Sequence, residues 1–278
     1  MPLIVFSHAN SFPAATYRVL FRSLRARGFA VKAVDRFGHD PAYPVTSNWP
    51  HLVRQLADFA GPEIEAHDGP AFLVGHSLGG FLSLMCAARH PLLGGKGVRG
   101  VLLLDSPLLG GWRARTLELI KRTQLVGSVS PGRVSRRRRS QWPSVEAALE
   151  HFGRKRPFRR WHPQMLRDYV EHCTHEDAAP GGATRRVLDF DPGVETAIYN
   201  TLPHNLDRLL ARHPLRCPVA FIGGTRSQEM RQVGMAMTLK VIGRGHTERI
   251  GMVEGSHLFP MEKPVETAAA IEAMLRRF

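Results

Sequence analysis

The chain has 278 residues, 43% of them hydrophobic, which is enough for a globular protein with one sizeable core. Its longest apolar runs fall well short of the ~20 residues that a bilayer span needs, and its start, MPLIVFSHAN, reaches polar residues too soon for a secretory signal, so we expect neither membrane insertion nor export. With 38 Lys and Arg residues against 24 Asp and Glu residues, the formal net charge is +14, and much of the excess lies between residues 106 and 216.

The first hundred residues alternate short apolar runs with amphipathic ones. Because strands separated by helices require crossover connections, this alternation predicts an α/β fold with a mostly parallel sheet. The predicted strands span residues 2–7, 29–34, 71–74 and 98–104, and the predicted helices span residues 14–27, 49–60 and 78–89.

The alternation stops after residue 106 and resumes near residue 217. Two further strands are predicted at residues 218–222 and 249–253, which makes about six, and a last helix from residue 265 to the C-terminus. We therefore predict an α/β core formed by residues 1–106 and 217–278, with residues 107–216 inserted as a helical cap. An amphipathic pattern over residues 194–210 predicts one helix in the cap.

The motif GHSLGG places Ser77 where a predicted strand becomes a predicted helix. A sharp strand-to-helix turn of this kind closes only if the flanking residues lack a bulky Cβ, and Gly75, Gly79 and Gly80 meet that need. A serine hydroxyl is a weak nucleophile near neutral pH and requires a base within hydrogen-bond reach. His257, in GSHLFPMEKP directly after the last predicted strand, is the best candidate for that base.

Four motifs together resemble the α/β-hydrolase superfamily, namely GHSLGG, VFSHANSFP at the start, DRFGHD after the second strand and GSHLFPMEKP near the end. The resemblance implies that the first strand here corresponds to the family's third, so that the usual first two strands are absent. It also implies an oxyanion hole from two backbone N–H groups, those of Leu78 and Asn10. In the loop after the first strand, the glycine that is common in the family is replaced by Ala9. The Asn10 side chain is a further candidate donor.

The acid that orients His257 is ambiguous in the sequence. The usual family position is the turn after PVAFIGG, where this chain has Ser227 instead of Asp. One substitute is Asp105, at the end of the strand GVLLLD, and the other is Glu229, two residues beyond Ser227. We favour Asp105 because a strand-end aspartate lies at the same sheet edge as Ser77, and we keep Glu229 as the alternative.

The remaining candidates concern ligands and partners. We expect His76, Ile198 and Leu202 to contact substrate. The group His172, Cys173, His175 and Glu176 is close in sequence but lacks a second ligand cluster, so no metal site is predicted. The arginine-rich runs at residues 135–140 and 153–160 are interpreted as a solvated face, with anionic substrates or surfaces as the alternative and nucleic acid as a weaker one. A homodimer is possible.

These residues predict a serine hydrolase that cleaves an ester or thioester of a small to medium acyl group through an acyl-enzyme. It would need no cofactor and no metal. Three cysteines without a CxxC spacing fit a cytoplasmic location. Acyl transfer to an alcohol, carbon–carbon cleavage and perhydrolysis need the same triad and stay open, as does a non-catalytic binding protein that keeps the scaffold.

Overall fold

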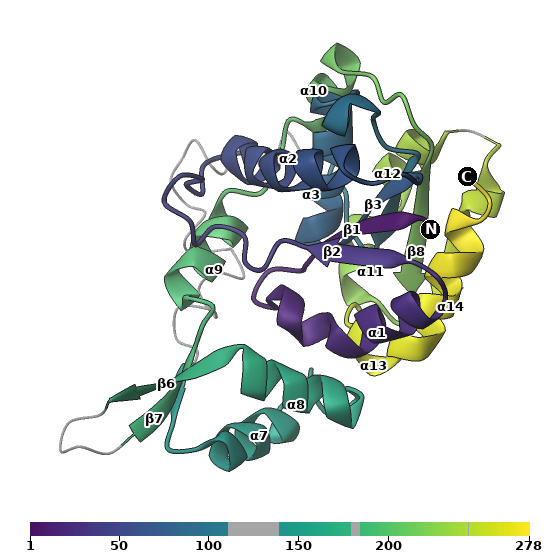
Figure 1. Cartoon of the computed structure of the whole chain (residues 1–278). Coiled ribbons are helices and arrows are strands. Elements are labelled where there is room, and N and C mark those ends of the chain that lie inside the picture. Colours follow the sequence, from purple (N-terminus) through teal and green to yellow (C-terminus); the bar gives the residue numbers. More distant parts are fainter. Residues whose placement is uncertain (111–138, 179–183, 244) are drawn as a thin grey trace.

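The structure is a computed structural model that describes residues 1–110, 139–178, 184–243 and 245–278 (Figure 1). Its described part contains a six-stranded sheet in which every neighbouring pair is parallel, as the alternating sequence predicted. In sheet order the strands are β2 (Ala30–Ala33), β1 (Leu3–Ser7), β3 (Ala71–His76), β4 (Gly100–Leu104), β8 (Val219–Gly224) and β9 (Ile250–Val253).

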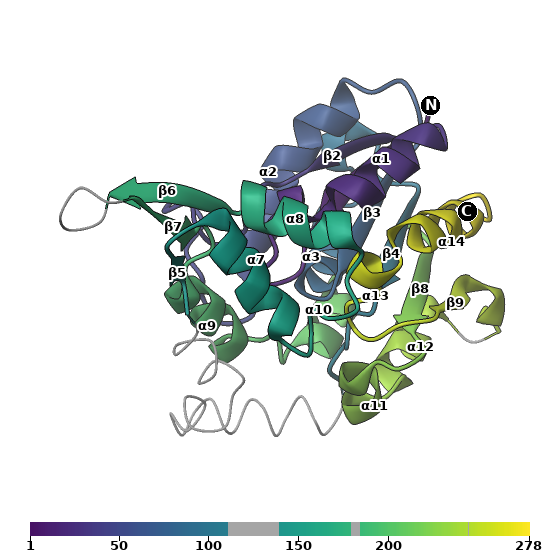
Figure 2. The same ribbon diagram turned by 90° about the horizontal axis from the view of Figure 1, so that it is seen from below.

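Helices cover both faces of this sheet, so that its central strands are fully buried (Figures 1 and 2). One face packs against α2 (Pro50–Glu65), α3 (Leu78–Arg89) and α12 (Ala236–Ile242). The other face packs against α1 (Arg18–Ala26) and α14 (Pro264–Leu275). Short helices complete the core, namely η1 (Ala14–Tyr17), η2 (Leu93–Gly95), α11 (Gln228–Val233), η3 (Thr247–Arg249) and α13 (Phe259–Glu262).

Strand side chains alternate between two separate apolar clusters because successive residues of a strand point to opposite faces. Leu3 and Val5 contribute to the cluster beneath α2 and α3, whereas Ile4 and Phe6 contribute to the one beneath α1 and α14. The near-continuous apolar runs of the sequence are therefore the signature of strands buried on both sides.

The chain between β4 and β8 contains helices and also a small antiparallel sheet, ordered β5-β7-β6, which the helical pattern did not predict. The paired strands β6 and β7 extend away from the rest of the molecule (Figure 2). The described elements of this segment are β5 (Gln141–Trp142), α7 (Val145–Arg154), α8 (Pro163–His172), β6 (Thr174–Ala178), β7 (Thr184–Leu188), α9 (Pro192–Asn200) and α10 (Leu206–Arg212).

The single helix predicted over residues 194–210 is two helices, α9 and α10, separated at Thr201–Asn205. Pro203 lies in the break, and proline removes a backbone N–H and clashes with the preceding turn of a helix. The break is also tied to the core, since the Trp49 indole N–H donates to Thr201 Oγ1 at 2.9 Å and the His204 N–H donates to Asn48 Oδ1 at 2.9 Å. These bonds fix α9 against the loop that precedes α2.

The structure describes one arginine-rich run completely and the other in part. In the arginine-rich run 153–160, the arginines 154, 156, 159 and 160 are exposed, as a solvated face requires, while residues 135–138 of the other run lie outside the described residues. Within the described ranges, no helix has both the length and the apolar character to cross a membrane.

The turn from β3 into α3 brings backbones unusually close together. A Cβ on Gly79 would overlap the carbonyl oxygen of Ser7 on β1, and a Cβ on Gly75 would overlap the carbonyl group of Gly79. A Cβ on Gly80 would overlap the hydroxyl of Ser106, which follows β4. The three glycines therefore let α3 begin directly over the ends of the neighbouring strands.

Replacing Gly79 with alanine should lower the free energy of unfolding by about 3 kcal/mol or more, because the obstructing atom is backbone of a central strand and cannot rotate away. The matched control is Gly153→Ala at an exposed position of α7, where a Cβ meets nothing within 4 Å and the stability should be unchanged or slightly increased. Chemical denaturation measures both. Equal stabilities of the two variants would contradict this account of the turn.

Candidate active site

Ser77 lies between the last residue of β3 and the first residue of α3, in a conformation that non-glycine residues rarely adopt (φ 53°, ψ −113°). The strained backbone is held by the surrounding structure. The Ser77 N–H donates to the Leu104 carbonyl of β4 at 2.9 Å, and the Gly80 N–H donates back to the Ser77 carbonyl at 3.1 Å. Backbone strain of this kind persists only where the surrounding structure holds it in place. Here it positions a partly exposed hydroxyl above the edge of the sheet.

His257 joins Ser77 to Asp105 by two short hydrogen bonds. The Ser77 hydroxyl lies 2.9 Å from His257 Nε2, and His257 Nδ1 lies 2.6 Å from Asp105 Oδ2. The three residues come from the carboxyl ends of β3 and β4 and from the loop after β9, which all meet at one edge of a parallel sheet. The structure therefore brings together a hydroxyl, an imidazole and a carboxylate in the order of a catalytic triad.

Several hydrogen bonds fix the position of Asp105. It has a positive φ of 45° at the end of β4, and its side chain is 0% exposed. The Gly224 N–H donates to Oδ1 at 2.7 Å, and the Ser227 hydroxyl donates to Oδ2 at 2.6 Å. These two donors leave the carboxylate unable to rotate away from the His257 ring.

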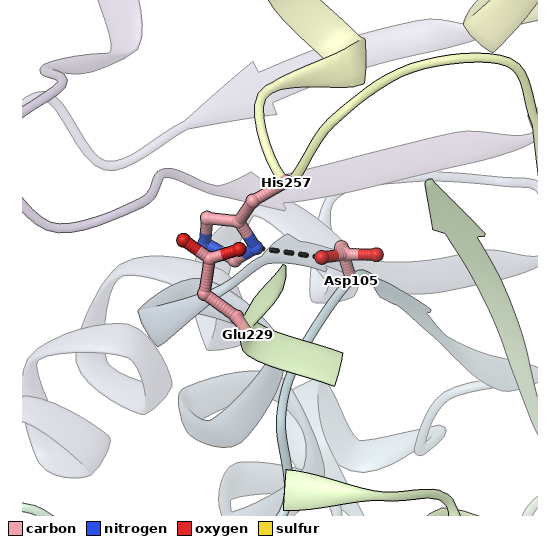
Figure 3. Close-up of side chains that lie close together, drawn as sticks. All are labelled: Asp105, Glu229 and His257. Atoms are coloured by element: carbon pink, nitrogen blue, oxygen red, sulfur yellow. Dashed lines mark hydrogen bonds and ion pairs between the residues drawn. The ribbon is translucent and has the colours of Figure 1, made fainter. Parts of the chain in front are cut away.

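Glu229, the alternative acid, lies beside the His257 ring but makes no hydrogen bond to it in the described part of the chain (Figure 3). It comes from the first turn of α11 and is exposed, and its Oε2 is 3.4 Å from the Ser227 hydroxyl. Asp105 and Glu229 thus flank the same imidazole, the first as its hydrogen-bond acceptor and the second as a nearby negative charge.

The environment of His257 favours its protonated form. Burial by itself would lower the pKa of the imidazole, but the hydrogen bond and charge of Asp105, with a further contribution from the charge of Glu229, outweigh burial and raise the pKa above its ordinary value of 6.5. A raised pKa makes the ring a better proton acceptor. It also means that the neutral, proton-accepting ring becomes more populated as the pH rises through that pKa.

The loop after β1 carries the second predicted oxyanion donor. In the described residues no group accepts a hydrogen bond from the N–H of Asn10 or of Leu78, so both donors remain available. The Asn10 side chain is not a free donor of this kind, because its Nδ2 donates to the Glu195 carbonyl of α9 at 3.1 Å. The buried His8 ring fixes the loop from behind by accepting from the Phe37 N–H at 3.0 Å, and burial lowers the pKa of His8 to about 4.

The residues expected to contact substrate are buried or partly buried. His76 is 0% exposed and has protein partners on both ring nitrogens. Ile198 is 1% exposed and belongs to the apolar core, close to Gly38, while the partly buried Leu202 packs against the same core. Ile198 thus lies on the face by which α9 packs onto the core of the parallel sheet.

Asp105, Glu229 and His257 also form a group of possible metal ligands, because their donor atoms all lie within 4.8 Å of one another. His257 Nδ1 is directed at Asp105 Oδ2, however, and must carry the proton of that 2.6 Å bond. The ring could bind a cation through this nitrogen only by losing the hydrogen bond.

The sequence also has a cluster of possible ligands at His172, Cys173, His175 and Glu176. Cys173 is buried with its thiol 3.4 Å from the Thr16 hydroxyl, and His175 contacts Asp189 at 2.6 Å.

Comparison with known proteins extends these observations. A family model described as "Alpha/beta hydrolase family" matches residues 4–270. None of the curated protein sequences matches the chain significantly.

Three similar solved structures are each below 25% identical to this chain, so the likeness concerns the fold. E-2-(acetamidomethylene)succinate hydrolase is 22% identical with a TM-score of 0.67, over 99% of this chain and 91% of the other. The thioesterase domain of the curacin biosynthetic pathway is 18% identical with a TM-score of 0.69, over 98% and 91%. A carboxylesterase of the thaumarchaeon Nitrososphaera gargenis is 18% identical with a TM-score of 0.58, over 99% and 90%.

The pKa of His257 provides a direct test of the two carboxylates. Asp105→Asn should lower it below 6.5, because burial then acts with little opposition, whereas Glu229→Gln should lower it by a smaller amount, because that charge is the weakest of the three raising influences. NMR titration of the His257 ring in a Ser77→Ala background measures both shifts. A larger shift for Glu229→Gln than for Asp105→Asn would contradict the geometry described above.

Proposed function

Since the chain belongs to the alpha/beta hydrolase family, we propose that it is a serine hydrolase which cleaves an ester or thioester of a small to medium acyl group through an acyl-enzyme. The observation that carries this proposal is the continuous hydrogen-bonded chain from Ser77 through His257 to Asp105. Ser77 is the nucleophile, His257 the general base and Asp105 the orienting acid. Glu229 is an auxiliary charge.

In the first half of the reaction, His257 Nε2 accepts the hydroxyl proton as Ser77 Oγ attacks the acyl carbonyl. The carbonyl oxygen becomes an oxyanion that the N–H groups of Leu78 and Asn10 stabilise, each worth roughly 3 kcal/mol in comparable acyl-transfer enzymes. The imidazolium then gives its proton to the leaving alcohol or thiol. Asp105 supports this step because its fixed negative charge stabilises the imidazolium without accepting the proton.

In the second half, His257 removes a proton from water, and the resulting hydroxide attacks the acyl-enzyme carbonyl. The same two N–H groups stabilise the second oxyanion. Collapse of this intermediate breaks the bond to Ser77 Oγ, which recovers its proton from His257, and releases the carboxylic acid. The residues of the chain are sufficient for every one of these proton transfers.

The substrate class follows from the nucleophile and from the kinds of hydrolase that share the fold. Relatives that displace halide or open epoxides need a carboxylate nucleophile, and Ser77 stands in that place here. The three similar structures named above are a hydrolase, a thioesterase domain and a carboxylesterase by their descriptions. We assign residues 107–216 the role of a cap, and α9 lies against the oxyanion loop through the bond between Asn10 and the Glu195 carbonyl.

An activated serine should react with a fluorophosphonate probe, and the probe should label wild type but neither Ser77→Ala nor His257→Gln. The same variants should lose hydrolysis of activated esters and thioesters by roughly 10⁴-fold or more, since the nucleophile and its base act as one unit. Ser83→Ala is the matched control, because its buried hydroxyl in α3 has no partner in the described residues. Absence of labelling in folded wild type would favour a binding protein on this scaffold.

The two carboxylates should differ in kinetic importance. Asp105→Asn should lower kcat by roughly 10³-fold to 10⁴-fold, because the amide stabilises the wrong ring tautomer and no longer offsets the imidazolium charge. Glu229→Gln should lower kcat by less than about 10-fold, because Glu229 only adds charge near a ring that Asp105 already orients. Steady-state kinetics on an activated ester distinguishes the variants, and the reverse order would make Glu229 the acid.

A further inference from the structure

A second chain of hydrogen bonds lies behind the triad, and the proposed reaction does not use it. The Ala9 N–H donates to the Tyr17 hydroxyl at 3.1 Å, that hydroxyl lies 2.8 Å from His76 Nδ1, and His76 Nε2 lies 2.9 Å from the carbonyl oxygen of His257. Tyr17 and His76 are both 0% exposed. Polar groups buried this deeply are costly unless they are paired, so the complete pairing here indicates a defined role.

The partners fix the direction of every bond in this chain. A carbonyl oxygen can only accept, so His76 Nε2 must carry a proton that it donates to His257. Burial, with the neighbouring His257 and His8, lowers the pKa of His76 well below its ordinary value, so the ring is neutral and Nδ1 carries no proton. Tyr17 must therefore donate to Nδ1 while accepting from Ala9, and burial raises the pKa of Tyr17, which keeps that proton on its hydroxyl.

This chain of hydrogen bonds connects the three loops on which the proposed chemistry depends. Ala9 immediately precedes Asn10, whose N–H is the proposed oxyanion donor, and His76 immediately precedes Ser77. The acceptor at the far end is the backbone of His257 itself. The side chain of His257 is already fixed by Asp105, but nothing in that bond fixes the backbone from which the ring projects.

We propose that Tyr17 and His76 form a buried positioning pair that holds the backbone of His257 and the oxyanion loop in register with Ser77. This inference deepens the proposed function and rests on it. Neither residue touches substrate, since both are enclosed by protein. Their effect is to keep His257 Nε2 and the Asn10 N–H within hydrogen-bond reach of the same reacting carbonyl, where a misplacement of about 1 Å can cost on the order of 10²-fold in rate.

Substitutions at His76 separate its two hydrogen bonds. His76→Gln places an amide N–H near the position of Nε2 and retains the donor to His257, whereas His76→Asn offers a group only near Nδ1 and retains the bond to Tyr17. His76→Phe retains the shape of the ring and neither bond. We expect kcat within about 5-fold of wild type for Gln, and losses of about 10-fold to 10²-fold for Asn and Phe, with KM changed by less than about 3-fold.

Tyr17→Phe removes the middle of the chain and leaves two buried groups unpaired, the Ala9 N–H and His76 Nδ1. It should lower kcat by about 10-fold to 10²-fold, again with little change in KM. Ser83→Ala, which removes a buried hydroxyl that has no partner in the described part of the chain, is the control and should leave kcat unchanged. Thermal unfolding of each variant establishes that the kinetics are measured on folded protein.

A second readout needs no turnover. The proton between His257 Nδ1 and Asp105 Oδ2, two atoms 2.6 Å apart, should give a far-downfield NMR signal. We expect that signal to be retained in His76→Gln and to broaden or move upfield in His76→Asn and His76→Phe. Inactive wild type with this pattern would overturn the proposed reaction but support the positioning pair. Equal kcat and an unchanged signal in Gln, Asn and Phe variants would overturn the pair.

Discussion

The 2.6 Å hydrogen bond between His257 and Asp105 is the interaction on which the arrangement of the site depends. It sets the ring tautomer, directs Nε2 at the Ser77 hydroxyl and offsets the cost of burying an imidazole. The bond is possible only because Asp105 is itself held by the Gly224 N–H and the Ser227 hydroxyl. These two donors fix the position of the carboxylate against the ring.

A parallel sheet explains why residues so distant in sequence meet. All strands of such a sheet end at the same edge, so the residues that follow β1, β3, β4 and β9 are neighbours whatever their separation along the chain. Ser77 and Asp105 leave their strands with positive φ angles of 53° and 45°, which turn their side chains above that edge. Backbone bonds to Leu104 and Ile222 hold these two strained residues in place.

The outcome for individual residues shows where sequence reasoning was limited. The sequence identified both Asp105 and Glu229 as acids because each follows a strand at this edge, and only atomic positions show which one accepts from the ring. His76 and Ile198 were expected at the substrate because one adjoins the nucleophile and the other lies on an amphipathic stripe. His76 is 0% exposed and Ile198 is 1% exposed, so both lie inside the protein.

Periodicity, glycine placement and strand-helix alternation by themselves determined the α/β architecture, the turn at Ser77 and the candidacy of His257, because these features depend on residues close together in the chain. Only the tertiary structure decided the acceptor for His257, the antiparallel sheet between β4 and β8, and the hydrogen bonds of Tyr17. The physical reason is that a hydrogen bond between distant segments depends on distances of a few tenths of an ångström, which the packing of the whole molecule sets and no local pattern records.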